Sequence, residues 1–258
     1  MDTFELSCIN YIDKHLSAPI GVNTFYHYTT MEALEGILCE HPEKGKEVCL
    51  WATHNRYFND PEELKTGAWM QTKILSGLRP EATREENETK VINRLKDLYI
   101  ISLSQVGDSL PMWNAYADKG NGVALGFKRL KSRNLEDVVV KCCYEPKELS
   151  QYIEEPHKIL ALLFSIYAPR IIKNDSYDYE KEVRLIGRFE EQPVLYRKKG
   201  YKNIPYKEIY FSKDQIESIT LGPCFSTDEN AAILKEFLDG RGLKHVEIKQ
   251  SKIPYRNI

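Results

Sequence analysis

The sequence predicts a mixed α+β fold in which a mixed or antiparallel β-core is flanked by helices. Short apolar strand patterns outnumber what a regular alternation of strand and helix supplies, and several lie close together, as strands of hairpins do. Neither an internal repeat nor a linker rich in Gly, Ser or Pro interrupts the 258 residues. We therefore expect one domain over residues 1–258, with a helical extension over residues 1–24.

The first third of the chain shows two strand-to-helix units. The aromatic run Phe25–Thr29 predicts a strand, and Thr29 with Glu32 forms a capping box for the helix that follows. The apolar run 48–53 predicts a second strand. A second capping box then starts a helix that should run from Pro61 towards residue 75.

Strands and helices continue to alternate irregularly through the rest of the chain. The charge-rich stretch 84–98 predicts a solvated surface helix with one apolar stripe. The pair Asn121-Gly122 predicts a hairpin turn. Further strands are predicted at 99–104, 122–127, 138–142, 182–187, 209–211, 216–221 and 246–248, and further helices at 110–116, from 156 and around 233–237.

Composition excludes several classes of protein. The 36 Lys and Arg residues nearly balance the 38 Asp and Glu residues, giving a net charge of −2, so a strongly basic nucleic-acid binder is not expected. No apolar run reaches the roughly 20 residues of a membrane-spanning helix, and no signal peptide is evident, which predicts a cytoplasmic protein without a membrane partner. The six scattered cysteines and the histidines lack metal-ligand spacing, so no metal is expected.

The strongest acidic motif is Asp178-Tyr179-Glu180-Lys181-Glu182-Val183-Arg184. In a strand, Glu180, Glu182 and Arg184 share one face, and the two carboxylates raise each other's pKa unless a cation such as Arg184 intervenes. A solvated charged face is the common alternative. The consecutive apolar residues at 185 and 186 indicate instead that both faces of this strand are covered.

Strand alternation also groups His27 with Thr29, and Ser102 with Ser104. His27 is either a hydrogen-bonded structural residue or a ligand-binding one. The two serine hydroxyls need a partner, which is either a neighbouring strand or a ligand.

Three further residues have open roles. Trp113 and Tyr116 form either an aromatic wall over a pocket or a packing contact between helix and sheet. Asn59 lies in the segment 57–61 that starts a helix, where its amide is not needed for capping and is free for another contact.

Taken together, these motifs resemble a bacterial family of proteins of unknown function. The resemblance spans residues 25–256. It rests on Tyr26-His27-Tyr28-Thr29, Phe58-Asn59-Asp60-Pro61-Glu62, Ile101-Ser102-Leu103-Ser104, Met112-Trp113-x-x-Tyr116, Gly122–Phe127, Tyr179–Arg184 and Ser251–Arg256.

The order of three elements is also similar to that of ADP-ribosyltransferases, which bind NAD on a split β-core. These enzymes carry His or Arg on the first strand, Ser-x-Ser or Tyr on a middle strand and a late catalytic Glu, often as Glu-x-Glu; those with Ser-x-Ser normally have Arg first. The resemblance implies that Glu180 and Glu182 are catalytic. It implies a cofactor-binding set of His27, Thr29, Tyr57, Asn59, Ser102, Ser104, Trp113, Tyr116 and Arg184.

In this resemblance, His27 holds an NAD ribose or amide, and the serines support the nicotinamide side and the carboxylates. Glu182 binds the nicotinamide-ribose hydroxyl and stabilises the oxocarbenium charge as nicotinamide leaves. Tyr57 or Trp113 stacks on the nicotinamide ring. The expected function is NAD-dependent modification of an unknown macromolecular acceptor, or NAD hydrolysis, in a toxin or phage-defence role. The alternative is a non-catalytic module that senses a nucleotide or a peptide.

Overall fold

The computed structural model describes residues 24–38, 47–58, 67–69, 71–72, 83–128, 130, 138–144 and 171–255. Within these residues, the strands are β1 (Phe25–Thr29), β2 (Glu47–His54), β3 (Tyr99–Ser104), β4 (Val123–Phe127), β5 (Val138–Lys141), β6 (Glu182–Gly187), β7 (Leu195–Lys199), β8 (Lys202–Ser212), β9 (Ile216–Leu221) and β10 (Glu247–Gln250). The α-helices are α2 (Met31–Ile37), α4 (Arg84–Leu95), α5 (Leu110–Tyr116) and α8 (Asp228–Gly240), and the 3-10 helices are η2 (Asn55–Tyr57), η3 (Asp118–Gly120), η4 (Asp175–Glu180) and η5 (Lys213–Gln215).

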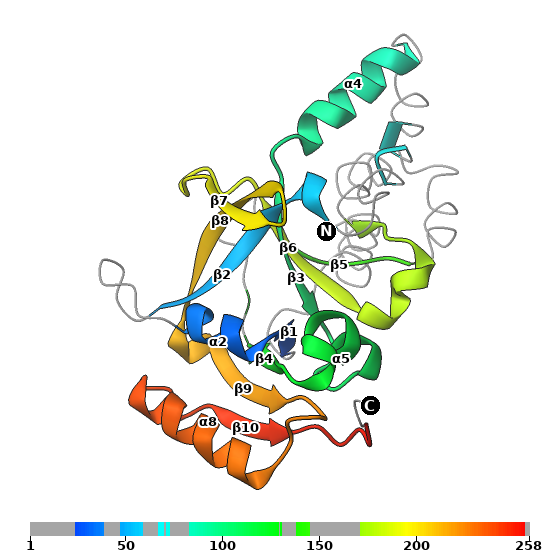
Figure 1. Cartoon of the computed structure of the whole chain (residues 1–258). Coiled ribbons are helices and arrows are strands. Elements are labelled where there is room, and N and C mark those ends of the chain that lie inside the picture. Colours follow the sequence, from blue (N-terminus) through cyan, green and yellow to red (C-terminus); the bar gives the residue numbers. More distant parts are fainter. Residues whose placement is uncertain are drawn as a thin grey trace, which may run out of the picture.

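The ten strands form one mixed sheet, which confirms the predicted α+β class (Figure 1). Its main path runs β10-β9-β4-β1-β3-β2-β8-β7, and β6 and β5 continue from the other edge of β3. Only β9 and β10 pair in parallel among these strands; the other pairs are antiparallel.

The sheet splits at β3, and this split positions the site. Along one edge, β3 pairs with β6 over its whole length. Along the other edge, β1 joins only at Ser104, while β2 joins only at Tyr99 and Ile100. The backbone of β3 between these two contacts therefore faces a gap between β1 and β2.

The main hydrophobic core covers one face of the strands on both sides of the split. Strand alternation places Phe25, Leu50 and Ile101 in this core, and α2 and α8 bury their apolar residues against it. A second cluster of Tyr28, Met112, Trp113, Ala117 and Ala124 lies between α5 and the opposite face of β1 and β4. Because both faces of β4 are covered, its side chains are held at fixed positions.

Several expected elements differ in detail from the structure. Thr30 caps α2, not Thr29, because Thr29 is still the last residue of β1; the Thr30 hydroxyl accepts a hydrogen bond from the Ala33 amide at 3.1 Å. The Asn121-Gly122 pair is not a hairpin turn, since β4 pairs with β1 and β9 and not with β3. The hairpin of β7 and β8 was not predicted. The extension over 1–24, most of the helix over 61–75, the helix from 156, and Asn59 fall outside the described residues.

Helix α4 is the surface helix expected from the charge-rich stretch, but it ends earlier, at Leu95. Thr83 and Glu86 form a complete capping box at its start. Asp97 adopts a positive φ of 66°, which turns the chain towards β3. Leu98, expected on the helix stripe, is buried just before the strand instead.

Gly122 stands where three backbone segments meet, and a larger residue is expected to destabilise the fold. A Cβ at this position would overlap the Thr29 carbonyl oxygen and lie 3.0 Å from the Ala117 backbone. We expect Gly122→Ala to lower the free energy of unfolding by about 1–3 kcal/mol, the range for forced overpacking. Urea denaturation measures this, with Gly36→Ala as the control because a Cβ at Gly36 meets no atom within 4 Å. Equal stability of the two variants would contradict the prediction.

Candidate functional site

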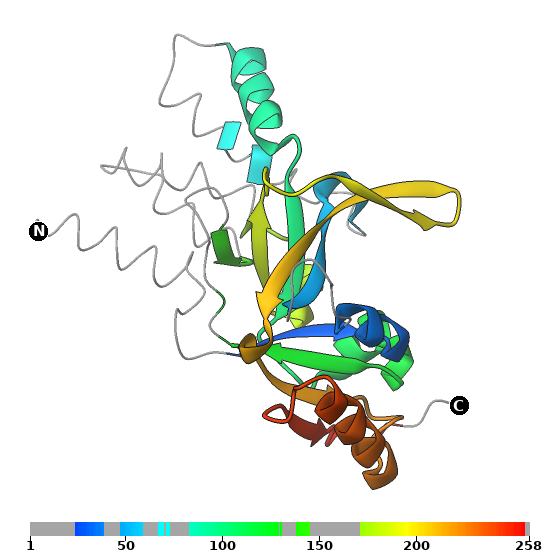
Figure 2. The same cartoon turned by 90° about the vertical axis from the view of Figure 1, so that its left-hand side faces the viewer.

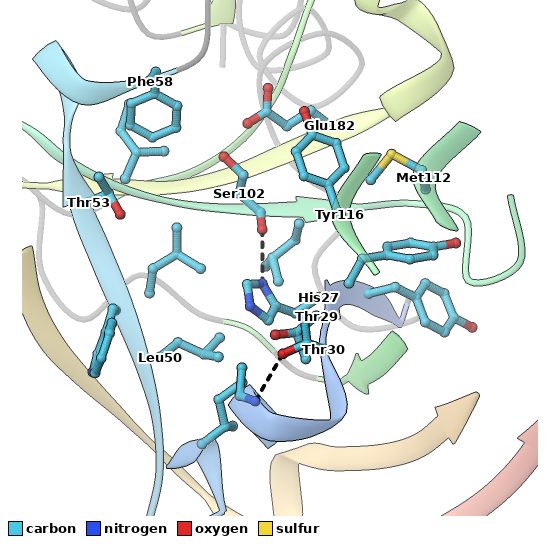
Figure 3. A pocket seen from close by; sticks show the side chains of 18 of the residues that line it. His27, Thr29, Thr30, Leu50, Thr53, Phe58, Ser102, Met112, Tyr116 and Glu182 are labelled. Carbon is cyan, nitrogen blue, oxygen red and sulfur yellow. Dashed lines mark hydrogen bonds between the residues drawn. The ribbon is translucent and has the colours of Figure 1, made fainter. Parts of the chain in front are cut away.

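A cavity of about 630 Å³ lies at the split of the sheet. This volume is within the range of about 300–1,000 Å³ that is typical of small-molecule sites. Its walls come from β1, β2 and β3, from α2 on one side, from η4 and the start of β6, and from the β7–β8 hairpin. Figure 3 shows His27, Ser102, Tyr116 and Glu182 around this cavity, with Ser102 between His27 and Glu182 in the view.

One end of the cavity holds a buried network of two carboxylates and two cations. The Lys173 ammonium contacts Oε2 of both Glu180 and Glu182, with 2.8 Å to Glu182. The Arg184 guanidinium donates to the same Glu182 oxygen at 2.9 Å, and the Cys142 thiol does so at 3.3 Å. All four charged residues are at most 8% exposed, and their formal charges sum to zero.

The two cations determine the protonation of Glu182. Burial alone raises the pKa of this carboxyl, but the charges of Arg184 and Lys173 outweigh burial and hold its pKa well below the usual range. Burial likewise lowers the pKa of Lys173, whereas Glu182 and Glu180 raise it to a value above the ordinary one. Glu182 is therefore an anion and Lys173 a cation throughout the physiological range.

This depressed pKa predicts how stability depends on pH. A carboxyl whose pKa is lowered on folding stabilises the native state fully above its ordinary pKa of about 4.5, and the contribution is lost as the pH falls towards the folded value. We expect the stability difference between the wild type and Glu182→Gln to be constant from pH 7 to 5 and to shrink below about pH 4.5. Urea denaturation at several pH values measures it. A difference that stays constant down to pH 3 would contradict the ion-pair account.

Local backbone geometry brings the two glutamates to the same lysine. Alternation predicted that Glu180 extends β6, but Glu180 is instead the last residue of η4. The strand cannot continue back to it because Lys181 adopts a left-handed conformation with φ of 43°. The Ser104 hydroxyl donates to the Glu180 carbonyl at 2.7 Å and fixes this turn against β3. The Tyr144 hydroxyl in turn accepts from the Glu182 amide at 2.8 Å.

Helix α5 supplies the second partner of Glu180. The Tyr116 hydroxyl donates to Glu180 Oε1 at 2.6 Å, and burial together with this contact raises the pKa of Tyr116. Asp108 fixes the start of α5, since its carboxylate accepts from the Trp113 indole at 2.8 Å and from Ser251 near the carboxyl end. The Met-Trp-x-x-Tyr and Ser-Lys-Ile-Pro motifs thus meet in one supporting structure.

His27 lies on β1 opposite the unpaired stretch of β3. Its Nδ1 is 3.4 Å from the Ser102 carbonyl oxygen, which can only accept a hydrogen bond, so this contact requires a proton on Nδ1. Burial lowers the pKa of His27, and the Ser102 carbonyl only partly offsets this effect. The neutral ring then has Nε2 as an acceptor for a hydroxyl or amide group of a ligand.

The hairpin end of the cavity is basic and aromatic. The Arg197 guanidinium lies over the Trp51 ring, 5.4 Å from its centroid, and donates to the Thr53 hydroxyl at 3.0 Å. Burial lowers the pKa of Arg197, and in the described part of the chain only Tyr206 offsets the shift, whereas no carboxylate does. Lys199 also lines this end. A partly desolvated cation without a carboxylate partner favours an anionic ligand.

The structure brings seven of the predicted site residues to the cavity: His27, Thr29, Tyr57, Ser102, Tyr116, Glu180 and Glu182. Ser104 and Arg184 lie behind it, where they support Glu180 and Glu182. Trp113 is fully buried against Tyr28 and does not border the cavity. It therefore packs the helix against the sheet and is not positioned to stack on a ligand in the cavity. Asn59 is outside the described residues.

Sequence reasoning missed Lys173 and Arg197. Lys173 lies just before the predicted acidic motif, and the pairing requirement of two close carboxylates is a signal that could have directed attention to nearby cations. Arg197 belongs to a polar run without a clear strand pattern. Among the described residues, no group of three or more His, Cys, Asp or Glu residues could hold a metal ion, and no helix is long and apolar enough to cross a membrane.

Fold and site together define a mixed α+β protein with a charge-balanced carboxylate pair in a cavity at the split of its sheet. A family model described as "Protein of unknown function (DUF2971)" matches residues 112–185, from α5 to β6. This match supports the expected resemblance to a family of unknown function over that range, which includes Lys173, Glu180 and Glu182. Searches of curated proteins and of solved structures find no match.

Proposed function

We propose that the cavity binds NAD and that the protein cleaves its bond between nicotinamide and ribose, passing ADP-ribose to an acceptor or to water. The observation that carries this proposal is the convergence of His27, Ser102 and Glu182 on one cavity, from strands far apart in the chain. The same three elements, in the same order, resemble those of ADP-ribosyltransferases.

The distribution of charge suits a dinucleotide. Arg197 and Lys199 offer cations to the phosphates at one end, where Trp51 also lines the cavity. At the other end Glu180 and Glu182 offer carboxylates to ribose hydroxyls. Nε2 of His27 can accept from the carboxamide or from a ribose hydroxyl between these ends.

The chemistry follows from the ionised state of Glu182. The C1′–N bond breaks heterolytically, and nicotinamide leaves with the electron pair, which neutralises its ring nitrogen. Positive charge develops on the ribose, and a carboxylate that is already ionised stabilises it without reorganisation. A nucleophile then forms the new bond to C1′ and passes its proton to Glu180.

Calorimetry with NAD tests the binding step. We expect one NAD per chain, and we expect His27→Ala to weaken binding about tenfold, consistent with the loss of one hydrogen bond of about 1.4 kcal/mol. Tyr196→Ala is the control, since this exposed residue does not line the cavity. Absence of binding at millimolar NAD would refute the proposal. Binding without nicotinamide release would favour the alternative, a nucleotide sensor.

A further inference from the structure

The hairpin of β7 and β8 is strongly positive, although the net charge of the whole chain is only −2. Between Glu191 and Glu208 the sequence has five Lys or Arg residues and no Asp or Glu. The remainder of the chain therefore carries −7, because the total is −2 and this segment contributes +5. Four of the five cations, Arg197, Lys198, Lys199 and Lys202, lie at the distal half of the hairpin.

The hairpin extends away from the rest of the sheet (Figure 2). Register pairs Arg197 with Ile204 and Lys199 with Lys202, so Arg197, Lys199 and Lys202 share one face. Arg197, Lys199 and Ile204 line the cavity, which shows that this is the cavity-facing side. A row of cations thus leads from the hairpin tip to the mouth of the cavity.

An exposed aromatic ring accompanies these cations at the tip. Tyr201 is 93% exposed, and the Lys202 ammonium lies 5.6 Å from its ring centroid. Tyr196 is also exposed, but it directly precedes Arg197 in β7 and therefore lies on the opposite face. Lysines on the edge strand β7 discourage pairing with another sheet. That role does not account for the exposed Tyr201 or for a row of cations directed at the cavity. Cations along a track with exposed aromatic rings are the features that bind single-stranded nucleic acid.

We propose that the β7–β8 hairpin binds single-stranded nucleic acid and presents it to the cavity as the acceptor of ADP-ribose. The acceptor role rests on the proposed function, whereas the binding does not. In the transfer step, a nitrogen or oxygen nucleophile of the strand forms the bond to C1′ of the ribose. Nicotinamide leaves with the electron pair of the C1′–N bond, and the proton of the nucleophile passes to Glu180 and then to solvent.

Fluorescence anisotropy with the full chain and a labelled 20-nucleotide single strand, without NAD, tests the binding. We expect Lys202→Glu to weaken binding at least about fivefold and to reduce the salt dependence of binding, by about 0.7 for each lost phosphate contact. Tyr201→Ala should weaken binding about tenfold through loss of stacking. Neither residue lines the cavity. Lys90→Glu, an exposed charge reversal on α4, is the matched control and should bind as the wild type does.

Three results would overturn the binding proposal. The first is no binding of the oligonucleotide, and the second is equal binding by the tip variants and the control. The third is that polyglutamate of matched charge displaces the labelled oligonucleotide as well as an unlabelled oligonucleotide does. Binding to anionic vesicles in place of the oligonucleotide would assign the hairpin to a membrane surface and would also overturn it. Incubation of the bound oligonucleotide with NAD then separates the acceptor role from the proposed function. If nicotinamide is released but no ADP-ribose is attached to the oligonucleotide, the acceptor role is wrong and the proposed function stands. If no nicotinamide is released, the acceptor role and the proposed function are both wrong.

Discussion

Replacing Glu182 by Gln is expected to reduce nicotinamide release from NAD at least about 100-fold, the scale of losing one preorganised group that stabilises transition-state charge. Gln keeps the shape of the side chain but carries no negative charge to place against the ribose. Chromatographic detection of nicotinamide measures the rate. Glu191→Gln is the matched control, because this glutamate is exposed and does not line the cavity.

The same substitution is expected to lower stability, so activity and folding need separate measurements. It leaves two buried cations, Lys173 and Arg184, with only one carboxylate, Glu180, in the network. Removing one partner of a buried ion pair costs about 3–5 kcal/mol. Adding Lys173→Met removes one uncompensated cation and should restore part of the stability without restoring nicotinamide release. Retained release in folded Glu182→Gln would refute the catalytic role.

Replacing Lys173 by Met alone is expected to lower the free energy of unfolding by about 3–5 kcal/mol at pH 7. Glu180 and Glu182 then lose the cation that both contact, and the pKa of Glu182 rises towards its ordinary value. Because the wild type itself loses the stabilisation from Glu182 below about pH 4.5, the difference between the two proteins should shrink in acid. Urea denaturation at pH 7 and pH 4 measures both values.

The control for this prediction is Lys181→Met. Lys181 forms an exposed ion pair with Asp178 at 2.6 Å, and exposed pairs contribute about 0–1 kcal/mol. The loss of stability in Lys181→Met should therefore be small at pH 7. If the two methionine variants were equally stable, Lys173 would not be the cation on which the carboxylate pair depends.

The sequence was most informative where a strand is covered on both faces. In β6, alternation predicted that Glu182 and Arg184 share a face, and they form an ion pair at 2.9 Å. The strand bounds 99–104 and 182–187 were also predicted correctly, because both are short segments rich in β-branched, aromatic and other apolar residues. Alternation was wrong for Glu180, where a 3-10 helix and a left-handed Lys181 replace the strand.

Contacts between distant segments could not be predicted from local patterns. The His27 ring reaches the Ser102 carbonyl across 75 positions in the chain. This contact exists because β1 and β2 join different ends of β3, and a periodicity in one strand carries no information about the length of its pairing. Trp113 illustrates the same limit, since an aromatic residue at helical spacing gives no indication of whether it faces a cavity or a core.

The most direct test of the central claim is a crystal structure of the wild-type chain with an NAD analogue in which a methylene group replaces the ring oxygen of the nicotinamide ribose. This analogue cannot form an oxocarbenium ion and remains intact. The account predicts the nicotinamide ribose within hydrogen-bond distance of Glu182, the carboxamide or a ribose hydroxyl at Nε2 of His27, and phosphates at Arg197. An analogue bound elsewhere, or a cavity left without it at saturating concentration, would contradict the account.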